Sequence, residues 1–114
     1  MQRVFKIIDE AEWARAVASG VFQGAAIDLA DGYIHLSNAA QVETTARLHF
    51  HGREGLLLVA FDAVVFGQSL KWEASRGGDL FPHVHGTITP ADALWAQPLP
   101  WTEKGHAFPN GWSS

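Results

Sequence analysis

Runs of alternating or continuous apolar residues divide the chain into a series of predicted strands and helices. Residues 3–8 alternate and are rich in β-branched side chains, which predicts a first strand. Asp9 then has the position of a helix N-cap with Glu12 as its capping-box partner, and Gly20 is a natural helix stop. The chain is therefore expected to open with a strand followed by a helix.

The next part of the chain predicts a second strand and a second helix. Residues 20–30 show no clear period and are expected to form a loop with some short extended structure. Residues 33–37 alternate, which predicts a strand. Residues 39–50 carry apolar side chains at helical spacing, and Gly52 ends that run.

The second half of the chain has the pattern of strands joined by loops. Residues 56–61 are continuously apolar, which is typical of a central strand covered on both faces. Residues 70–73, 83–88 and 93–97 are shorter predicted strands. Beyond them Pro, Gly and Trp dominate and the periodicity disappears, so this tail is expected to pack loosely.

Composition supports one folded domain. The chain has 114 residues, of which 47% are hydrophobic and 18% charged, so it can bury a core and is not expected to be disordered. We therefore expect a single α+β domain over residues 1–100, with a mostly antiparallel or mixed sheet, and an irregular tail over residues 101–114. The absence of cysteine excludes disulfides, thiolate-bound zinc and thiol nucleophiles.

The net charge and the hydropathy of the chain limit the kinds of binding partner that we expect. The net charge is −4 and the basic residues are scattered, so duplex nucleic acid is not an expected partner. The N-terminus lacks the apolar core of a signal peptide, and the longest apolar run is too short to span a bilayer. A cytoplasmic location without membrane contact is the expectation.

Two of the predicted strands carry a polar face that bears histidine. Alternation places His35 and Ser37 on one side of the first strand, and His83 and His85 on one side of the other. If the two strands line one groove, these side chains converge where imidazole can transfer protons, bond a ligand or bind a metal. The alternative is that each histidine is a half-exposed strand residue bonded to backbone.

Glu73 and Arg76 extend this candidate site. Glu73 follows Trp72, and a carboxylate beside a large aromatic ring can have a raised pKa or can stabilise positive charge on a substrate. Arg76 stands before two glycines and could reach a pyrophosphate. A metal on His83 and His85 would need His35 or Glu73 as a third ligand. No recognised zinc signature occurs, and no metal is expected.

Three blocks in order resemble the conserved blocks of a bacterial family catalogued as domain of unknown function 952. They are DGYIHLS at residues 31–37, KWE at residues 71–73 and FPHVHG at residues 81–86. The resemblance covers about residues 3–97. One departure is His85, where the family usually has tyrosine, and this departure argues against a metal site common to the family.

The resemblance implies an ADP-ribosyltransferase-like fold, with two small sheets around a cleft, two N-terminal helices and NAD as the ligand of active relatives. By that analogy His35 and Ser37 would bind a ribose or the nicotinamide amide, and Glu73 would stabilise an oxocarbenium-like transition state. Catalysis would thus rest on Glu73 and His35. The substrate-binding residues would be Tyr33, Ser37, Trp72, Arg76, His83 and His85.

Three functional hypotheses follow. The first is a domain that binds NAD or ADP-ribose and carries out glycosyl transfer. The second is a non-catalytic domain that binds a small nucleotide-like or acidic metabolite, or a partner protein, in the same groove. The third is a histidine-ligated metalloprotein.

Overall fold

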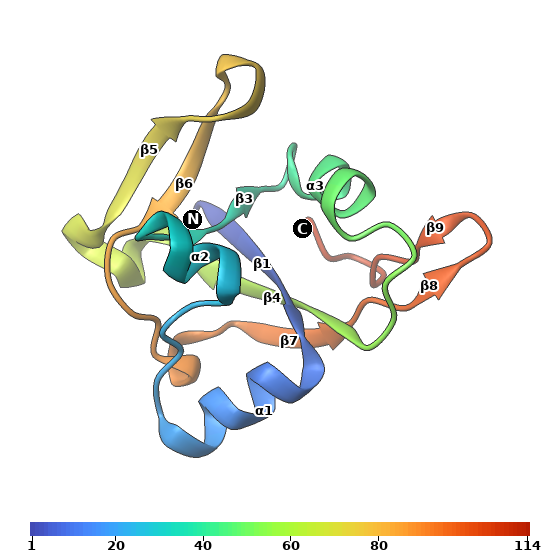
Figure 1. Ribbon diagram of the computed structural model, residues 1–114, viewed down its shortest axis with the longest axis horizontal. Helices are drawn as coiled ribbons and strands as arrows, with labels where there is room; N and C mark the ends of the chain where they lie inside the picture. The colour runs from blue at the N-terminus through green and yellow to red at the C-terminus, as the bar shows by residue number, and fades with distance from the viewer.

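The computed structural model describes the backbone of residues 1–114 and every side chain except that of Arg76. Helices and strands are mixed along the chain, as an α+β protein requires (Figure 1). The helices are α1 (Glu10–Ser19), α2 (Ala26–Asp31) and α3 (Val42–His49), with 3-10 turns at Ala63–Ser69, Arg76–Gly78 and Pro90–Asp92. The strands are β1 (Arg3–Asp9), β2 (Ile34–His35), β3 (Ser37–Asn38), β4 (Leu56–Asp62), β5 (Leu70–Ala74), β6 (Leu80–Val84), β7 (Trp95–Pro98), β8 (Trp101–Thr102) and β9 (Gly105–His106).

The strands form two main sheets and a small hairpin. The larger sheet has the order β3-β1-β4-β7, the smaller sheet has the order β2-β6-β5, and β8 pairs with β9. Every strand pair in the described structure is antiparallel. In Figure 1 the β5–β6 hairpin projects away from the larger sheet. The chain passes from one sheet to the other between β2 and β3.

The opening of the chain forms as its sequence predicts. β1 pairs along its whole length with β4, from Arg3 opposite Asp62 to Asp9 opposite Leu56. Asp9 caps α1, since its Oδ1 accepts hydrogen bonds from the N–H groups of Ala11 at 2.9 Å and Glu12 at 3.2 Å. Both expectations, the strand and its following helix, are confirmed.

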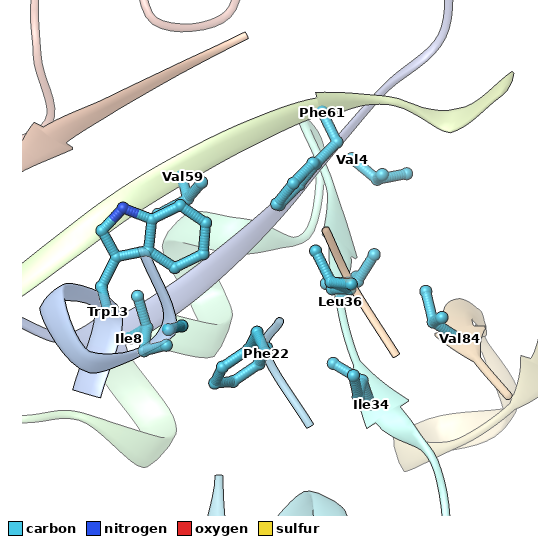
Figure 2. Packing of buried hydrophobic residues seen from close by; sticks show 11 residues of the cluster. Val4, Ile8, Trp13, Phe22, Ile34, Leu36, Val59, Phe61 and Val84 are labelled. Atoms are coloured by element: carbon cyan, nitrogen blue, oxygen red, sulfur yellow. The ribbon is translucent and has the colours of Figure 1, made fainter. Parts of the chain in front are cut away.

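The two faces of the larger sheet bury two separate cores. On one face Val4, Ile8, Val59 and Phe61 pack with Trp13 of α1 (Figure 2). On the other face the alternate residues of β1 and β4 pack with α3 and with the end of the chain. Because both faces are covered, β4 is continuously apolar, as expected for a central strand.

Several predicted boundaries are wrong. The range 20–30, expected to be a loop, contains α2, a six-residue helix without a capping side chain at Ala25. The strand expected over residues 33–37 is interrupted at Leu36, where the chain changes sheets. The strand expected at residues 83–88 is β6, which runs earlier, over Leu80–Val84, so His85 and the residues up to Ile88 lie beyond its end. Pro82 can lie in this strand with its carbonyl accepting from the N–H of Leu36.

The C-terminal tail is more ordered than its composition predicts. It contains the β8–β9 hairpin, so an irregular tail was the wrong expectation. Leu99 is fully buried, and Phe108 and Trp112 pack against the second core. The Trp112 ring lies edge-on to Phe5 of β1, with centroids 5.2 Å apart. The tail therefore covers one face of the larger sheet.

Candidate functional site

Glu73 holds two histidines through one of its oxygens. In the β5–β6 register Lys71 lies opposite His83, so alternation puts Glu73 on the same face as His83. Oε1 of Glu73 lies 2.9 Å from Nδ1 of His83 and 2.7 Å from Nε2 of His85. The hydrogen bonds from His85 and then from His83 lower the pKa of Glu73. The raised pKa considered for Glu73 beside Trp72 is therefore wrong.

Tyr33 packs among the histidines. Its ring centroid lies 4.2 Å from that of His83, 4.8 Å from that of His35 and 5.3 Å from that of His85, the last in a stacked arrangement. His35 pairs with His83 across β2 and β6, and their ring centroids are 5.5 Å apart. One tyrosine and three imidazoles thus form a single aromatic cluster.

A buried aspartate in α2 organises His35. Oδ1 of Asp28 lies 2.7 Å from Nδ1 of His35 and also accepts from the backbone N–H of His35 at 3.0 Å. Its Oδ2 accepts from the backbone N–H of Ala25 at 2.8 Å, which closes the first turn of α2. Because an ionised carboxylate only accepts, the proton of His35 lies on Nδ1.

Lys6 neutralises Asp28 inside the protein. Its Nζ lies 2.9 Å from Oδ2 of Asp28 and donates to the backbone oxygen of His35 at 3.0 Å. Burial lowers the pKa of Lys6, although the nearby Asp28 opposes that shift. Burial alone would raise the pKa of Asp28, but the charge of Lys6 and the hydrogen bonds from His35 outweigh it and leave that pKa lowered. Lys6 and Asp28 therefore form a buried ion pair whose members stabilise each other's charge.

Asp31 contacts the other side of the His35 ring. Its Oδ2 lies 2.9 Å from Nε2 of His35. Both ring nitrogens of His35 therefore lie within hydrogen-bond distance of a carboxylate oxygen, one from Asp28 and one from Asp31.

A cavity of about 630 Å³ opens beside these groups. Both sheets contribute to its wall, together with α2, α3 and Arg53. The site residues at the wall are Lys6, Asp31, His35, Ser37 and His83, and the apolar ones include Phe5, Ile8 and Phe81. His83 is buried and its Nδ1 is bonded to Glu73. Among the side chains that the structure describes, none bonds to Nε2 of His83, which leaves that nitrogen for a ligand.

The structure brings most of the expected site residues together, in two groups. His35, Ser37 and His83 line the cavity, and the Ser37 hydroxyl lies 3.0 Å from Oγ1 of Thr45. Tyr33, Glu73 and His85 lie behind this wall and contact the lining histidines.

Two other expected residues are not brought to the cavity wall. Trp72 points to the opposite face of β5 and packs against the first core, so it is not placed to stack on a ligand in the cavity. The side chain of Arg76 lies outside the described part of the chain.

Sequence reasoning missed Lys6, Asp28 and Asp31. Lys6 carried a detectable signal, because it interrupts an apolar strand between Val4 and Ile8, at a position that alternation turns toward the core. A buried lysine needs a partner of opposite charge. Asp28 carried no such signal, since it lies in a range expected to be a loop.

The histidines make no metal site with their neighbours as placed. Within the described side chains, no group of three or more His, Asp or Glu residues has the geometry to hold a metal ion. His83 and His85 instead share one carboxylate oxygen. No helix in the described chain is long and apolar enough to cross a bilayer.

Comparison with known proteins identifies the family. The model of the family described as protein of unknown function (DUF952) matches residues 7–96. The chain belongs to this family.

The DUF952 chain is also similar to solved structures of protein CC0527 from Caulobacter crescentus. The crystal structure is 42% identical with a TM-score of 0.87, and each chain is covered to 91%. The solution structure has a TM-score of 0.82, with 91% of this chain and 90% of that chain covered. No curated protein matches the chain.

Proposed function

We propose that the cavity binds a small nucleotide-like metabolite of the NAD or ADP-ribose class and that glycosyl transfer takes place there. The observation that carries the proposal is the setting of His83. Its ring is buried, its Nδ1 is held by Glu73, and its Nε2 has no partner among the described side chains at the cavity wall. An imidazole held in this way is suited to take a proton from a bound substrate.

The size and lining of the cavity support a small-molecule ligand. Its volume of about 630 Å³ is in the range of cofactor and metabolite pockets. Its wall combines apolar side chains with a few polar groups that could orient a ligand, including the Ser37 hydroxyl and the His35 ring. Residues from both antiparallel sheets form this wall, an arrangement compatible with an ADP-ribosyltransferase-like fold as part of the same proposal.

The proposed step moves one proton and breaks one glycosidic bond. The hydroxyl of an acceptor attacks the ribose carbon that carries nicotinamide. The bond from that carbon to the nicotinamide nitrogen breaks, and its electron pair stays on the nitrogen, so nicotinamide leaves as a neutral molecule. The proton of the acceptor passes to Nε2 of His83. Glu73, at Nδ1, stabilises the imidazolium that forms.

This assignment changes the role first expected for Glu73. Its carboxylate does not line the cavity, and its Oε1 is engaged by His83 and His85. Glu73 therefore acts through His83 as a positioning residue and does not contact the sugar. The same observation favours a second candidate, a domain that binds the metabolite without turnover, because no carboxylate of β5 reaches the reacting carbon.

Binding and turnover can be measured separately. We expect NAD or ADP-ribose, at about a hundred times its dissociation constant, to stabilise the protein by roughly 2.7 kcal/mol in thermal melting. The informative variant is His83→Asn, because the asparagine amide can still donate to Glu73 but lacks a counterpart of Nε2. This variant should bind NAD or ADP-ribose with an affinity within a few-fold of the wild type, and it should no longer release nicotinamide from NAD.

A Lys104→Gln variant in the exposed β8–β9 turn serves as the control and should behave as the wild type. Binding by wild-type protein without nicotinamide release would favour the second candidate. Absence of any stabilisation by either compound would overturn the proposal.

A further inference from the structure

The edge of β1 is paired for only part of its length. β3 pairs with β1 at two positions, Val4 with Asn38 and Phe5 with Ser37. Continuing that antiparallel register would place His35 opposite Ile7. At Leu36, however, the chain leaves this edge, and His35 pairs with His83 in the smaller sheet. The slot beside Ile7 is therefore without a strand.

The ladder shows which backbone groups face this slot. The N–H of Glu10 donates to the oxygen of Gly55, and the N–H of Ala63 donates to the oxygen of Gln2, so even-numbered residues of β1 bond toward β4. In an antiparallel ladder the alternate residues point the other way. The N–H and C=O of Ile7 consequently point away from β4, toward the open edge.

The backbone of His35, which would have paired with Ile7, has other partners. Its N–H donates to Oδ1 of Asp28, and its oxygen accepts from Nζ of Lys6. The Lys6–Asp28 pair has thus replaced Ile7 as the partner of this segment. Among the residues that the structure describes, none supplies a partner for the N–H or the C=O of Ile7.

The slot is part of the cavity. Five consecutive residues of β1, Phe5 to Asp9, line it, and α2 and α3 contribute residues on either side. The side chain of Ile7 is buried in the second core, whereas its N–H and C=O point toward the open edge of β1. Buried backbone donors and acceptors are nearly always paired in folded proteins. An unpaired donor and acceptor beside a cavity therefore favour a ligand with complementary groups.

We infer that the backbone of Ile7 binds a flat ligand group that carries a hydrogen-bond donor and an acceptor side by side. The ligand group would pair with Ile7 as a neighbouring strand does. This inference rests on the proposed function and deepens it, since two parts of a dinucleotide such as NAD have that chemistry. One is the carboxamide of nicotinamide, and the other is the amino edge of adenine. The backbone selects for the donor–acceptor pair and tolerates no carboxylate, which lacks the donor.

The test uses the two halves of NAD with protein labelled at isoleucine and at histidine with nitrogen-15. Nicotinamide mononucleotide is compared with nicotinic acid mononucleotide, and AMP with its N6,N6-dimethyl derivative, because each analogue lacks the donor. We expect one half to move the amide resonance of Ile7, and its analogue to bind about tenfold more weakly without that shift. Ile88 is the internal control, because it does not line the cavity and its N–H donates to the backbone oxygen of Phe22, so its amide resonance should not move.

The outcomes separate the inference from the proposed function. The inference is supported if one mononucleotide shifts the amide resonance of Ile7 and its analogue without the donor does not. That result also shows which end of the dinucleotide occupies the slot. Shifts at the His35 and His83 rings without a shift at Ile7 would overturn the inference and leave the proposed function standing. No shift at either place with millimolar NAD would overturn both.

Discussion

Lys6 and Asp28 form an ion pair inside the protein, with Nζ of the lysine 2.9 Å from Oδ2 of the aspartate. The two residues are 22 positions apart in the sequence and lie in β1 and α2. Asp28 in turn holds the backbone and the ring of His35. The pair therefore connects the larger sheet, α2 and the cavity. Loss of either charge should change the position of the His35 ring at the cavity wall.

Replacement of Lys6 by methionine should destabilise the protein strongly. Lys6→Met leaves Asp28 as a buried charge without its cation, and breaking a buried pair in this way costs about 3–5 kcal/mol. Urea unfolding of Lys6→Met, Asp28→Asn and the double variant measures the effect. The double variant should lose clearly less stability than the sum of the two single losses, because the charges depend on each other. Additive losses would show that the two residues act independently.

Stability should fall in acid through Asp28. The folded state lowers the pKa of this carboxyl below its ordinary value of 3.8, so its ionised form stabilises the fold. That contribution is fully present above the ordinary value and is lost as the pH falls through the lowered folded-state pKa. Urea midpoints measured from about pH 5 down to about pH 2.5 should therefore fall less steeply for Asp28→Asn than for the wild type. Parallel curves for the two proteins would contradict this role.

Two glycines on either side of α2 should respond differently to alanine. Gly24 has φ +125°, and an added Cβ would lie 2.9 Å from Cβ of Asp28. Gly32 has φ +87°, and a Cβ there would meet nothing within 4 Å. Gly32→Ala should thus cost only the left-handed backbone conformation, about 1–2 kcal/mol. Gly24→Ala should cost more and disturb the His35 resonances, because it displaces Asp28. Equal losses in urea unfolding would argue against the close approach of Gly24 to Asp28.

The C-terminal tail should contribute to global stability. Trp112 packs its ring on Phe5 and Phe108, with centroid distances of 5.2 and 5.0 Å. Trp112→Ala should therefore destabilise the protein by about 2 kcal/mol, somewhat below the value for a fully buried aromatic residue. Lys104→Ala, in the exposed turn between β8 and β9, is the matched control and should change the unfolding midpoint little. An unchanged midpoint in Trp112→Ala would mean that the tail is not part of the core.

Features that depend on near neighbours were predictable from the amino-acid order. Alternation identified β1, Asp9 identified the start of α1, and the continuous apolar run identified β4. The polar face of the strand at His35 and the pairing of His83 with Glu73 across a hairpin follow the same period-two rule. The candidate site could be anticipated to that extent because the side-chain direction in a strand is a local property.

Contacts between distant segments determined the rest. The start of β6 before Pro82, the break at Leu36 and the helix around Asp28 depend on which strands and charges meet in space. The periodicity of a single segment holds no information on its contacts with distant segments. Lys6 is an example, because its burial is tolerated only where an aspartate from another element neutralises its charge. Long-range pairing of this kind created the cavity and left the edge of Ile7 open.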